Sequence, residues 1–322
     1  MINSKRNHSM KHDRSSSRPA ATVAGGVRGA ASLPALTILT PTFNRCHLLP
    51  RLHGSILAQN VAPGRVEWLV VDDGSTDATA GWLAARAAEG PLPLRHVSTV
   101  NGGKHRALNR GAELARADWA MLVDSDDWLL DGALCHALEL IGRFGADPRI
   151  GSLVSPLQIT GRPQNRFALT RNPCSQAERL RVERHFDTCT IRRVAAMRAA
   201  PFPEIPGETF LAESWQHFAV SRTYLTHLDN TPLVAGEYQP DGLSARSLRL
   251  RRAAPLGAMR VCDEMLASNL PLRHRLRARI NRARFWWHAR DQGKRPAQSP
   301  GVIAAALALP LYLRDRWALR RG

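Results

Sequence analysis

The sequence predicts an α/β fold in which a mostly parallel sheet is covered by helices on both faces. Short apolar, β-rich segments alternate with segments of helical periodicity over residues 35–130. Such alternation is typical of β-α-β units, whose parallel strands are joined by right-handed helical crossovers. Each expected strand also ends in polar or glycine-rich residues. Because the carboxyl ends of parallel strands meet at one edge of a sheet, these residues are expected to form a ligand site there.

Three helices are expected between four strands in this first part of the chain. The first strand, Ala-Leu-Thr-Ile-Leu-Thr, is rich in residues that favour β-structure, and Pro41 is expected to end it. The expected strands are residues 35–40, 66–71, 94–99 and 119–123, and the expected helices are residues 48–59, 78–88 and 104–116.

Beyond residue 130 the pattern is less regular. Helices are expected at residues 134–143, at 194–199 and from about Ser214, and strands at 151–157, at 188–191 and within 233–244. Residues 161–181 are polar and predict no regular element. From Arg246 onward the pattern predicts arginine-rich helix. The expected architecture is therefore an α/β domain followed by a basic helical region.

The positive charge lies at the two ends of the chain. The formal net charge is +18, but residues 1–33 contribute +5 and residues 243–322 contribute +14, which leaves residues 34–242 at −1. The first segment also lacks large apolar residues and is expected to be disordered. Basic arms of this kind suit an anionic membrane leaflet or a polyanion. The expected divisions of the chain are residues 1–33, 34–130, 131–244 and 245–322.

Cysteine usage and hydropathy favour a cytoplasmic protein. The five cysteines are odd in number, are scattered and form no Cys-x-x-Cys pair, which argues against a disulfide framework and a zinc site. The longest apolar run, residues 302–313, is interrupted by Pro310 and is shorter than the roughly 20 residues that span a bilayer. We therefore expect a cytoplasmic location with peripheral contact to the inner face of the membrane through the basic arms.

Three carboxylates follow the fourth expected strand. Apolar Met121–Val123 lead directly into Asp124, Ser125, Asp126 and Asp127. Closely spaced acids repel one another unless a cation compensates them, and carboxylate oxygens are ligands that Mg²⁺ and Mn²⁺ prefer. The alternative is a set of solvated caps on a strand-helix turn. A metal site is favoured because Asp72 and Asp73, one β-α unit earlier, are expected at the same edge.

A glycine pair precedes the third expected helix. Asn101–Lys104 has the sequence Asn-Gly-Gly-Lys, which allows a phosphate to approach the backbone closely and adds one cation near the amides of a helix N-terminus. Lys104 is preferred over its neighbours His105 and Arg106, because successive residues of a helix face different ways. Taken alone, the pair also fits an ordinary turn.

Four segments together resemble the nucleotide-binding half of a family 2 glycosyltransferase with the GT-A fold. They are TILTPTFNR (residues 37–45), VVDDGSTD (70–77), NGGKHRALNRG (101–111) and LVDSDDWL (122–129), and they occur in that order and spacing. The resemblance covers residues 35–244 and is strongest up to Leu130. It implies that residues 34–130 bind a nucleotide-sugar and that residues 131–244 bind the acceptor.

The resemblance implies contacts to the nucleotide from the ends of the first strands. Thr42 and Asn44 would line the nucleotide pocket. Asp72 or Asp73 would meet the uracil or the ribose, with Asp73 preferred for the base. Lys104 would neutralise the diphosphate.

The acids after the fourth strand resemble the Asp-x-Asp motif of the family. Asp124, Ser125 and Asp126 match its three positions. Asp126 or Asp127 would hold the metal ion, with Asp124 near the ribose or sugar and as a further metal candidate. The implied cofactor is Mn²⁺ or Mg²⁺.

The segment FPEIPGETFLAESW, residues 202–215, resembles the acceptor-side element of a bacterial subgroup, where a carboxylate at a helix start acts as general base. Glu213 is the first candidate and Glu208 the second, although a surface or capping role is the alternative for each. His217, in the same expected helix, is a candidate for binding metal or acceptor. The favoured alternative is an ordinary packed or surface histidine. The chain lacks the Gln-x-x-Arg-Trp motif of processive members, which favours single sugar additions.

The expected function is metal-dependent transfer of a sugar from a nucleoside-diphosphate sugar, with UDP-sugar preferred as the donor. The expected acceptor is a hydroxyl of a surface glycan or of a lipid-linked molecule, and the resemblance favours inversion at the anomeric carbon. Two alternatives remain open. One is a polyanion- or nucleic-acid-binding protein with an inactive domain of this fold, although nucleic acid is not the expected partner. The other is a nucleotidyltransferase with a carboxylate-bound metal.

Overall fold

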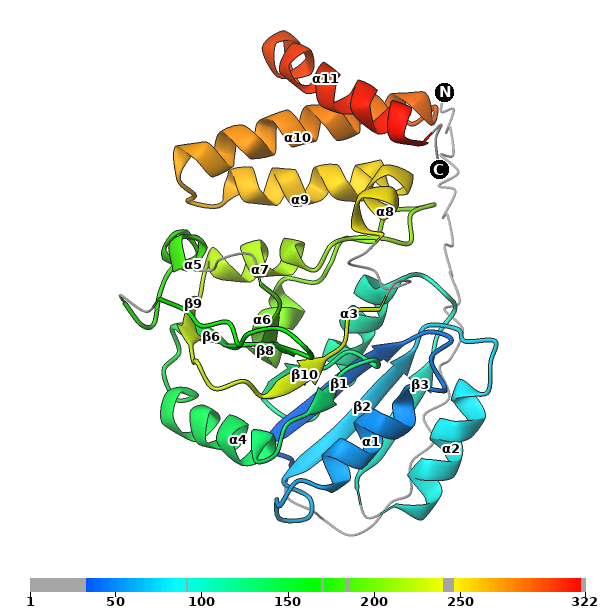
Figure 1. Cartoon of the computed structure of the whole chain (residues 1–322), viewed down its shortest axis with the longest axis vertical. Coiled ribbons are helices and arrows are strands. Elements are labelled where there is room, and N and C mark those ends of the chain that lie inside the picture. The colour runs from blue at the N-terminus through cyan, green and yellow to red at the C-terminus, as the bar shows by residue number, and fades with distance from the viewer. Residues whose placement is uncertain (1–32, 91, 169–170, 183–185, 240–245, 320–322) are drawn as a thin grey trace, which may run out of the picture.

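The computed structural model describes residues 33–90, 92–168, 171–182, 186–239 and 246–319 (Figure 1). The expected disordered tail therefore lies, apart from Leu33, outside the described residues. The described part is built on a seven-stranded sheet with the order β3-β2-β1-β4-β8-β6-β9. A three-stranded sheet, β5-β10-β7, accompanies it.

The first half of the chain forms the parallel part of the large sheet. Its strands pair in parallel in the order β3-β2-β1-β4, as the β-α alternation predicts. These elements are β1 (Leu36–Thr42), α1 (Leu49–Leu57), β2 (Val66–Asp72), α2 (Thr79–Glu89), β3 (Leu94–Ser98), α3 (Lys104–Leu114) and β4 (Trp119–Leu122).

Alternate residues of the strands pack against helices on opposite faces of the sheet. Leu36 and Ile38 of β1 belong to an apolar cluster that includes residues of α1, α2 and α4 (Ala133–Phe144). Leu39, the next residue along β1, belongs to a second cluster that includes residues of α3 and α6 (Val194–Ala199). The period of two in a strand thus produces the expected cover of helices on both faces.

Pro41 does not end β1 as the sequence predicted. The strand continues to Thr42, and Pro41 lies opposite Val71 of β2. The ladder between β1 and β4 stops at Leu39, so from there β1 has only one neighbouring strand. A proline is tolerated at such a position because the missing N–H faces no second strand.

The second half of the chain completes the same sheet. β8 (Thr188–Arg193) runs antiparallel to both β4 and β6 (Ile150–Pro156), and β9 (Leu225–Leu228) runs parallel to β6 at the edge. The small sheet joins β5 (Trp128–Leu129), β7 (Gln158–Ile159) and β10 (Val234–Gly236). Residues 34–130 and 131–244 thus share one sheet.

Some elements were not predicted. Helix α5 (Gln176–Val182) lies within the segment expected to be irregular, and β5, β7 and β9 were not expected as strands. The helix expected near Ser214 is present as α7 (Ser214–Ser221).

The arginine-rich region forms four helices, as expected. They are α8 (Ser247–Ala253), α9 (Pro255–Ala267), α10 (Leu272–Asp291) and α11 (Val302–Leu319). Figure 1 shows α9, α10 and α11 stacked beyond α7, with α11 farthest from the sheet. No helix among the described residues is long and apolar enough to cross a membrane.

Candidate active site

Lys104, at the start of α3, joins two predicted site residues at the carboxyl edge of the sheet. Its Nζ lies 2.6 Å from Oδ1 of Asp124, which follows β4, and 2.5 Å from Oε1 of Glu213, which precedes α7. Burial lowers the pKa of the Lys104 ammonium, but the two carboxylates outweigh this and raise that pKa well above its ordinary value. The structure therefore brings together the expected phosphate-binding cation, the acid run and the first candidate base.

Asp73 fixes the glycine loop that leads into α3. Its Oδ1 accepts the amide of Gly102 at 2.9 Å and its Oδ2 accepts the amide of Gly103 at 2.7 Å. Asn101 adds a bond from its side chain to the Asp73 carbonyl oxygen at 2.9 Å. Burial raises the pKa of the Asp73 carboxyl, and the two glycine amides oppose the rise. In this structure the Asp73 carboxylate holds the loop that positions Lys104.

Gly103 allows the acceptor-side segment to pack directly on this loop. Its φ is +96°, and a Cβ atom built there would lie 1.7 Å from the carbonyl oxygen of Thr209. Only glycine fits both the backbone conformation and this approach.

Helix α3 holds the same segment at two further points. The Asn109 side chain exchanges two hydrogen bonds with the backbone of Phe202, at 2.8 and 2.9 Å. Arg106 donates to the carbonyl oxygen of Ile205 at 3.3 Å. These contacts fix residues 202–209 on α3, and the chain then reaches Glu213 beside Lys104. Asn109 lies within one of the four family-like segments, but its contact with Phe202 was not predicted.

Glu213 stands at the N-cap position of α7, but its side chain does not cap the helix. Its carbonyl oxygen accepts the amide of Gln216 at 3.0 Å, while the carboxylate makes no capping hydrogen bond. The side chain is 41% exposed and contacts Lys104 through Oε1. The carboxylate is therefore accessible to a substrate.

Glu208, the second candidate base, is placed differently. It is 3% exposed, and its oxygens accept the amides of Leu256 at 3.1 Å and Gly257 at 2.7 Å in the first turn of α9. Lys294 forms an ion pair with it at 2.6 Å. Because these groups enclose the carboxylate, Glu208 links the acceptor-side segment to the C-terminal helices and is closed to an acceptor hydroxyl.

The three acids after β4 carry more negative charge than their surroundings neutralise. Burial raises the pKa values of Asp126 and Asp127, and the Asp124 carboxylate adds to both rises. The charge of Asp187 also raises the pKa of Asp127. The sequence did not predict that Asp187 lies near this acid. Asp127 lies against β10, where a Cβ on Gly236 would come within 2.3 Å of its Oδ1.

This excess of negative charge fits a divalent cation. The donors are carboxylate oxygens, which Mg²⁺ and Mn²⁺ prefer. Within the described residues, no three His, Cys, Asp or Glu side chains are grouped closely enough to hold a metal ion by themselves. The carboxylates of this run suit an ion that takes several of its oxygen ligands from outside the protein.

The other expected nucleotide-binding residues lie at the ends of β1 and β2. Asn44, with φ +52°, accepts the Thr76 amide through its side-chain oxygen at 2.7 Å. Asp72 accepts the Ser75 amide at 2.9 Å and the Ser98 hydroxyl at 3.2 Å. These two side chains shape the loop after β2.

Two further predicted residues are largely buried. The Oγ1 of Thr42 has no hydrogen-bond partner, and Thr42 is 4% exposed at the end of β1. Ser125, within the acid run, is 7% exposed. All the predicted residues except Glu208 thus line the carboxyl edge or the loops that form it.

His217 is a packed residue of α7. Its Nδ1 lies 3.0 Å from Nη2 of Arg192 and 3.3 Å from Nη1 of Arg179. Burial, followed by the charges of these two arginines, lowers the pKa of His217 well below its ordinary value. Its Nδ1 is therefore an acceptor for the guanidinium groups, as the packing alternative predicted.

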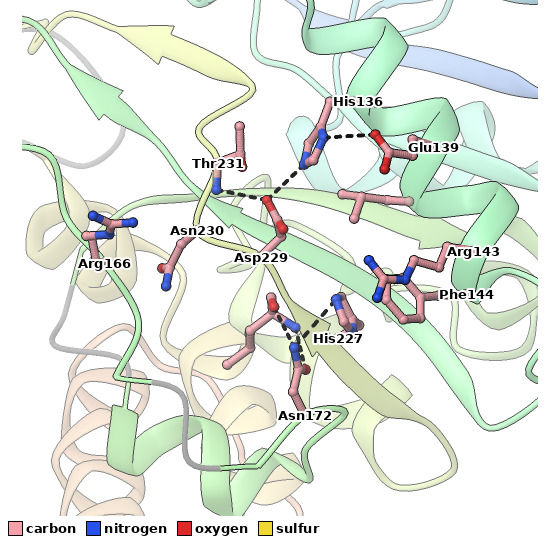
Figure 2. Close-up of a pocket in the computed structure, with 12 residues that line it drawn as sticks. His136, Glu139, Arg143, Phe144, Arg166, Asn172, His227, Asp229, Asn230 and Thr231 are labelled. Carbon is pink, nitrogen blue, oxygen red and sulfur yellow. Dashed lines mark hydrogen bonds and ion pairs between the residues drawn. The ribbon is translucent and has the colours of Figure 1, made fainter.

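A cavity of about 360 Å³ lies apart from this cluster, between α4 and the segment after β9 (Figure 2). His136 contacts Asp229 at 3.0 Å, and Asp229 also accepts the amide of Thr231 at 2.8 Å. His227 stacks on Phe144, with ring centroids 3.7 Å apart. No residue that lines this cavity was predicted for the site or belongs to the Lys104 cluster.

Residues 37–205, just over half of the chain, match the Glycosyl transferase family 2 model. The chain belongs to glycosyl transferase family 2. The matched range includes the four quoted segments and ends before Glu213, so the resemblance predicted from the sequence is confirmed for the donor-side half.

Curated relatives of this family 2 chain match it in part. Validoxylamine A glucosyltransferase of Streptomyces hygroscopicus subsp. limoneus is 38% identical over 100 residues, which are 30% of this chain and 22% of that protein. PGL/p-HBAD biosynthesis glycosyltransferase of Mycobacterium bovis is 34% identical over 111 residues, 34% of this chain and 42% of that protein. The chain thus spans less than half the length of these relatives.

Solved structures share the fold over a longer range. Staphylococcus aureus TarS 1-349 in complex with UDP-GlcNAc has a TM-score of 0.58 at 19% identity, covering 80% of this chain and 72% of that one. The mannosyltransferase PcManGT from Pyrobaculum calidifontis, in complex with GDP-Man and Mn²⁺, has a TM-score of 0.56 at 20% identity, covering 90% and 81%. The expected GT-A fold is therefore confirmed.

Proposed function

We propose that this family 2 chain transfers a sugar from a UDP-sugar to a hydroxyl of a glycan or lipid-linked acceptor, with inversion at the anomeric carbon and with Mn²⁺ or Mg²⁺ as cofactor. The observation that carries the proposal is the position of Lys104, whose Nζ contacts both Asp124 and Glu213. Donor-side and acceptor-side groups therefore meet around one ammonium group.

Support for the donor class comes from proteins of the same fold. TarS was solved with UDP-GlcNAc, and PcManGT was solved with GDP-Man and Mn²⁺. Both ligands are nucleoside-diphosphate sugars, whose diphosphate needs compensating positive charge. Lys104 provides one such charge in this chain.

Glu213 is proposed as the general base. Its side chain is 41% exposed, so the carboxylate can accept the proton of an acceptor hydroxyl as that hydroxyl attacks the anomeric carbon. Lys104 would lie against the diphosphate and stabilise the charge that develops as it leaves. Asp126 or Asp127 would hold the metal ion, with Asp124 beside the ribose or sugar. The ion would supply further positive charge at the leaving diphosphate.

The nucleotide side is proposed to consist of Thr42, Asn44, Asp72 and Asp73. The unpartnered Oγ1 of Thr42 supports a contact there, since a buried hydroxyl without a partner is uncommon. Asp72 and Asp73 would act at the base and ribose while they hold their loops.

A matched pair of substitutions tests the base. Glu213→Gln should lower the rate of sugar transfer by at least about 100-fold, since a positioned general base contributes that much. The dissociation constant for UDP in Mn²⁺ should change by less than about twofold. Glu208→Gln should keep transfer near the wild-type rate while it lowers thermal stability. Active Glu213→Gln with inactive but folded Glu208→Gln would move the role to Glu208.

A thermal-shift screen tests the class of function. UDP-sugars with Mn²⁺ should raise the melting temperature more than GDP- or dTDP-sugars, because a ligand that binds the native state stabilises it. If no nucleotide-sugar raises the melting temperature and DNA binding falls steeply with salt, the polyanion-binding alternative holds. Turnover of nucleoside triphosphates would instead favour the nucleotidyltransferase.

A further inference from the structure

Helix α11 turns an apolar face toward solvent. Its most exposed large apolar side chains are Val302 at 87%, Ile303 at 78% and Trp317 at 56%. Leu307 at 54% and Leu313 at 52% lie on the same side of the helix, since these positions cluster at a period of 3.6 residues. No described segment covers them. Exposed apolar groups that form one continuous strip mark an interaction surface.

The opposite face of α11, which includes buried Ala308, Tyr312 and Asp315, packs against α10. Asp315 is 1% exposed and forms an ion pair with Arg284, and it lies 3.0 Å from Nε2 of His288. Tyr312 donates a hydrogen bond to Asp291. Turning the apolar strip inward would bury it at the cost of these bonds, leaving Arg284 and Asp315 without partners. The outward direction of the strip is therefore built into the packing.

The neighbouring surface of α10 combines exposed leucines with arginines. Leu272 is 78% and Leu276 51% exposed, and Arg273 and Arg277 beside them are also exposed. A groove of about 450 Å³ joins this surface to α11 at Leu311. Apolar side chains bordered by arginines thus extend across both helices.

The two adjacent tryptophans of α10, Trp286 and Trp287, are not part of this strip. Trp287 packs against α11, donating from Nε1 to the carbonyl oxygen of Ala305 at 3.3 Å, and Trp286 lies in an apolar cluster with Met259 and Phe285. The interaction surface is therefore formed by other residues than the aromatic pair.

We propose that this α10–α11 surface docks on a lipid bilayer that contains anionic phospholipids, with both helices lying in the plane of the interface. Apolar residues would enter the boundary between headgroups and acyl chains, and the arginines would contact phosphate groups. Residues 243–322 carry a net charge of +14, which complements such a leaflet. A second copy of the chain fits poorly, because a symmetric contact would place arginines against arginines. The proposal does not depend on the enzymatic activity.

Sedimentation of the full chain with vesicles tests this proposal. Wild-type protein should bind vesicles of phosphatidylcholine and phosphatidylglycerol (3:1) at least tenfold more tightly than vesicles of phosphatidylcholine alone. The triple variant Ile303→Ser/Leu307→Ser/Leu313→Ser should lose at least tenfold in affinity for the anionic vesicles. Val100→Ser, at an apolar side chain 84% exposed elsewhere on the chain, is the control and should bind as wild type.

Substitutions of two arginines test the electrostatic contribution to vesicle binding. Arg273→Gln and Arg277→Gln should each weaken binding to anionic vesicles about fivefold, which is about 1 kcal/mol per basic residue at an anionic surface. Thermal melting of every variant checks the fold, since all these side chains are exposed. Trp317→Phe provides a second measurement, because it should remove part of the blue shift in fluorescence that anionic vesicles cause.

Three outcomes would overturn the proposal. The first is a folded triple variant that binds vesicles as tightly as wild type. The second is equal binding to neutral and anionic vesicles with no effect of the arginine substitutions. The third is a dimer in vesicle-free buffer that the triple variant dissociates, which would assign the surface to a second copy of the chain.

Discussion

At the carboxyl edge of the sheet, Lys104 contacts Asp124 and Glu213, whose side chains are 44% and 41% exposed. In the C-terminal helices, Asp315 contacts Arg284, and these side chains are 1% and 10% exposed. The first ion pairs are open to solvent, so a substrate can replace one partner. The second is enclosed and has no route for exchange. Ion pairs of similar length are thus accessible to a ligand in one region and enclosed by packing in the other.

The apolar residues of the two regions differ in the same way. Strand β1 of the sheet buries its apolar residues completely, with Ile38 and Leu39 both at 0% exposure, and polar groups collect at the strand ends. Helix α11 instead buries a carboxylate and exposes Val302 and Ile303. The sheet thus keeps these apolar side chains inside, whereas α11 exposes several of its own.

Breaking the enclosed pair should have the largest effect on stability. Asp315→Ala should destabilise the packing of α11 on α10 by about 3–5 kcal/mol, because it leaves Arg284 buried without a partner. Hydrogen exchange of α11 amides, compared with those of β1, measures this locally. Asp291→Asn is the control, since Asp291 is 43% exposed, and should change stability by less than about 1 kcal/mol. Equal effects of the two substitutions would show that Asp315 does not fix α11.

The next largest effect on stability is expected at Gly103, where the glycine loop packs closely on the segment that contains Thr209. Gly103→Ala should lower the free energy of unfolding by about 3 kcal/mol, because the new Cβ meets the Thr209 carbonyl oxygen and the backbone conformation favours glycine. Urea denaturation measures the loss. Gly142→Ala in α4, where a Cβ meets nothing within 4 Å, should be neutral or stabilising by up to about 1 kcal/mol. A neutral Gly103→Ala would mean that the segment can move away from α3.

The smallest effect on stability is expected from substituting one of the acids that follow β4. Because burial and neighbouring acids raise the pKa of Asp127, the native state binds a proton more tightly than the unfolded state. Stability of the metal-free protein should therefore fall as the pH rises from about 4 through that raised pKa. Asp127→Asn should remove this contribution and stabilise the protein at pH 8 in EDTA.

Calorimetric melts of wild type and Asp127→Asn at pH 5 and pH 8 give the comparison. Added Mn²⁺ should narrow the difference at pH 8, since a bound cation favours the ionised carboxylates. A wild-type melting temperature in EDTA that rises between these pH values while that of the variant stays constant would contradict the raised pKa.

The sequence predicted the parallel half of the fold well because its central strands are buried on both sides and are mostly apolar. In Val66–Asp72 every residue is buried, and only Glu67 and Asp72 are charged. It did not predict β9, Leu225–Leu228, which lies at the sheet edge and contains a threonine and a histidine. The two-residue strands β5 and β7 depend on pairing with β10, and local sequence carries no signal for such distant partners.

The candidate site was predictable in so far as it follows from strand order. Residues at the ends of β1, β2 and β4 meet because parallel strands end at one edge. The enclosure of Glu208 was not predictable, because Leu256, Gly257 and Lys294, which surround its carboxylate, are far away in the sequence. The position of Glu213 depends in turn on contacts such as that between Asn109 and Phe202.

The pairing of β4 with β8 has a consequence for recombining this chain with related ones. Leu122, two residues before Asp124, lies opposite Thr190 of β8, so residues 34–130 and 131–244 meet through this antiparallel ladder as well as through the pairing of β5 with β10. A shift of one residue in that ladder would turn every side chain of β8 to the other face. Chimeras that exchange the acceptor half at residue 130 must therefore preserve the register of β8 as well as the loops that face the substrate.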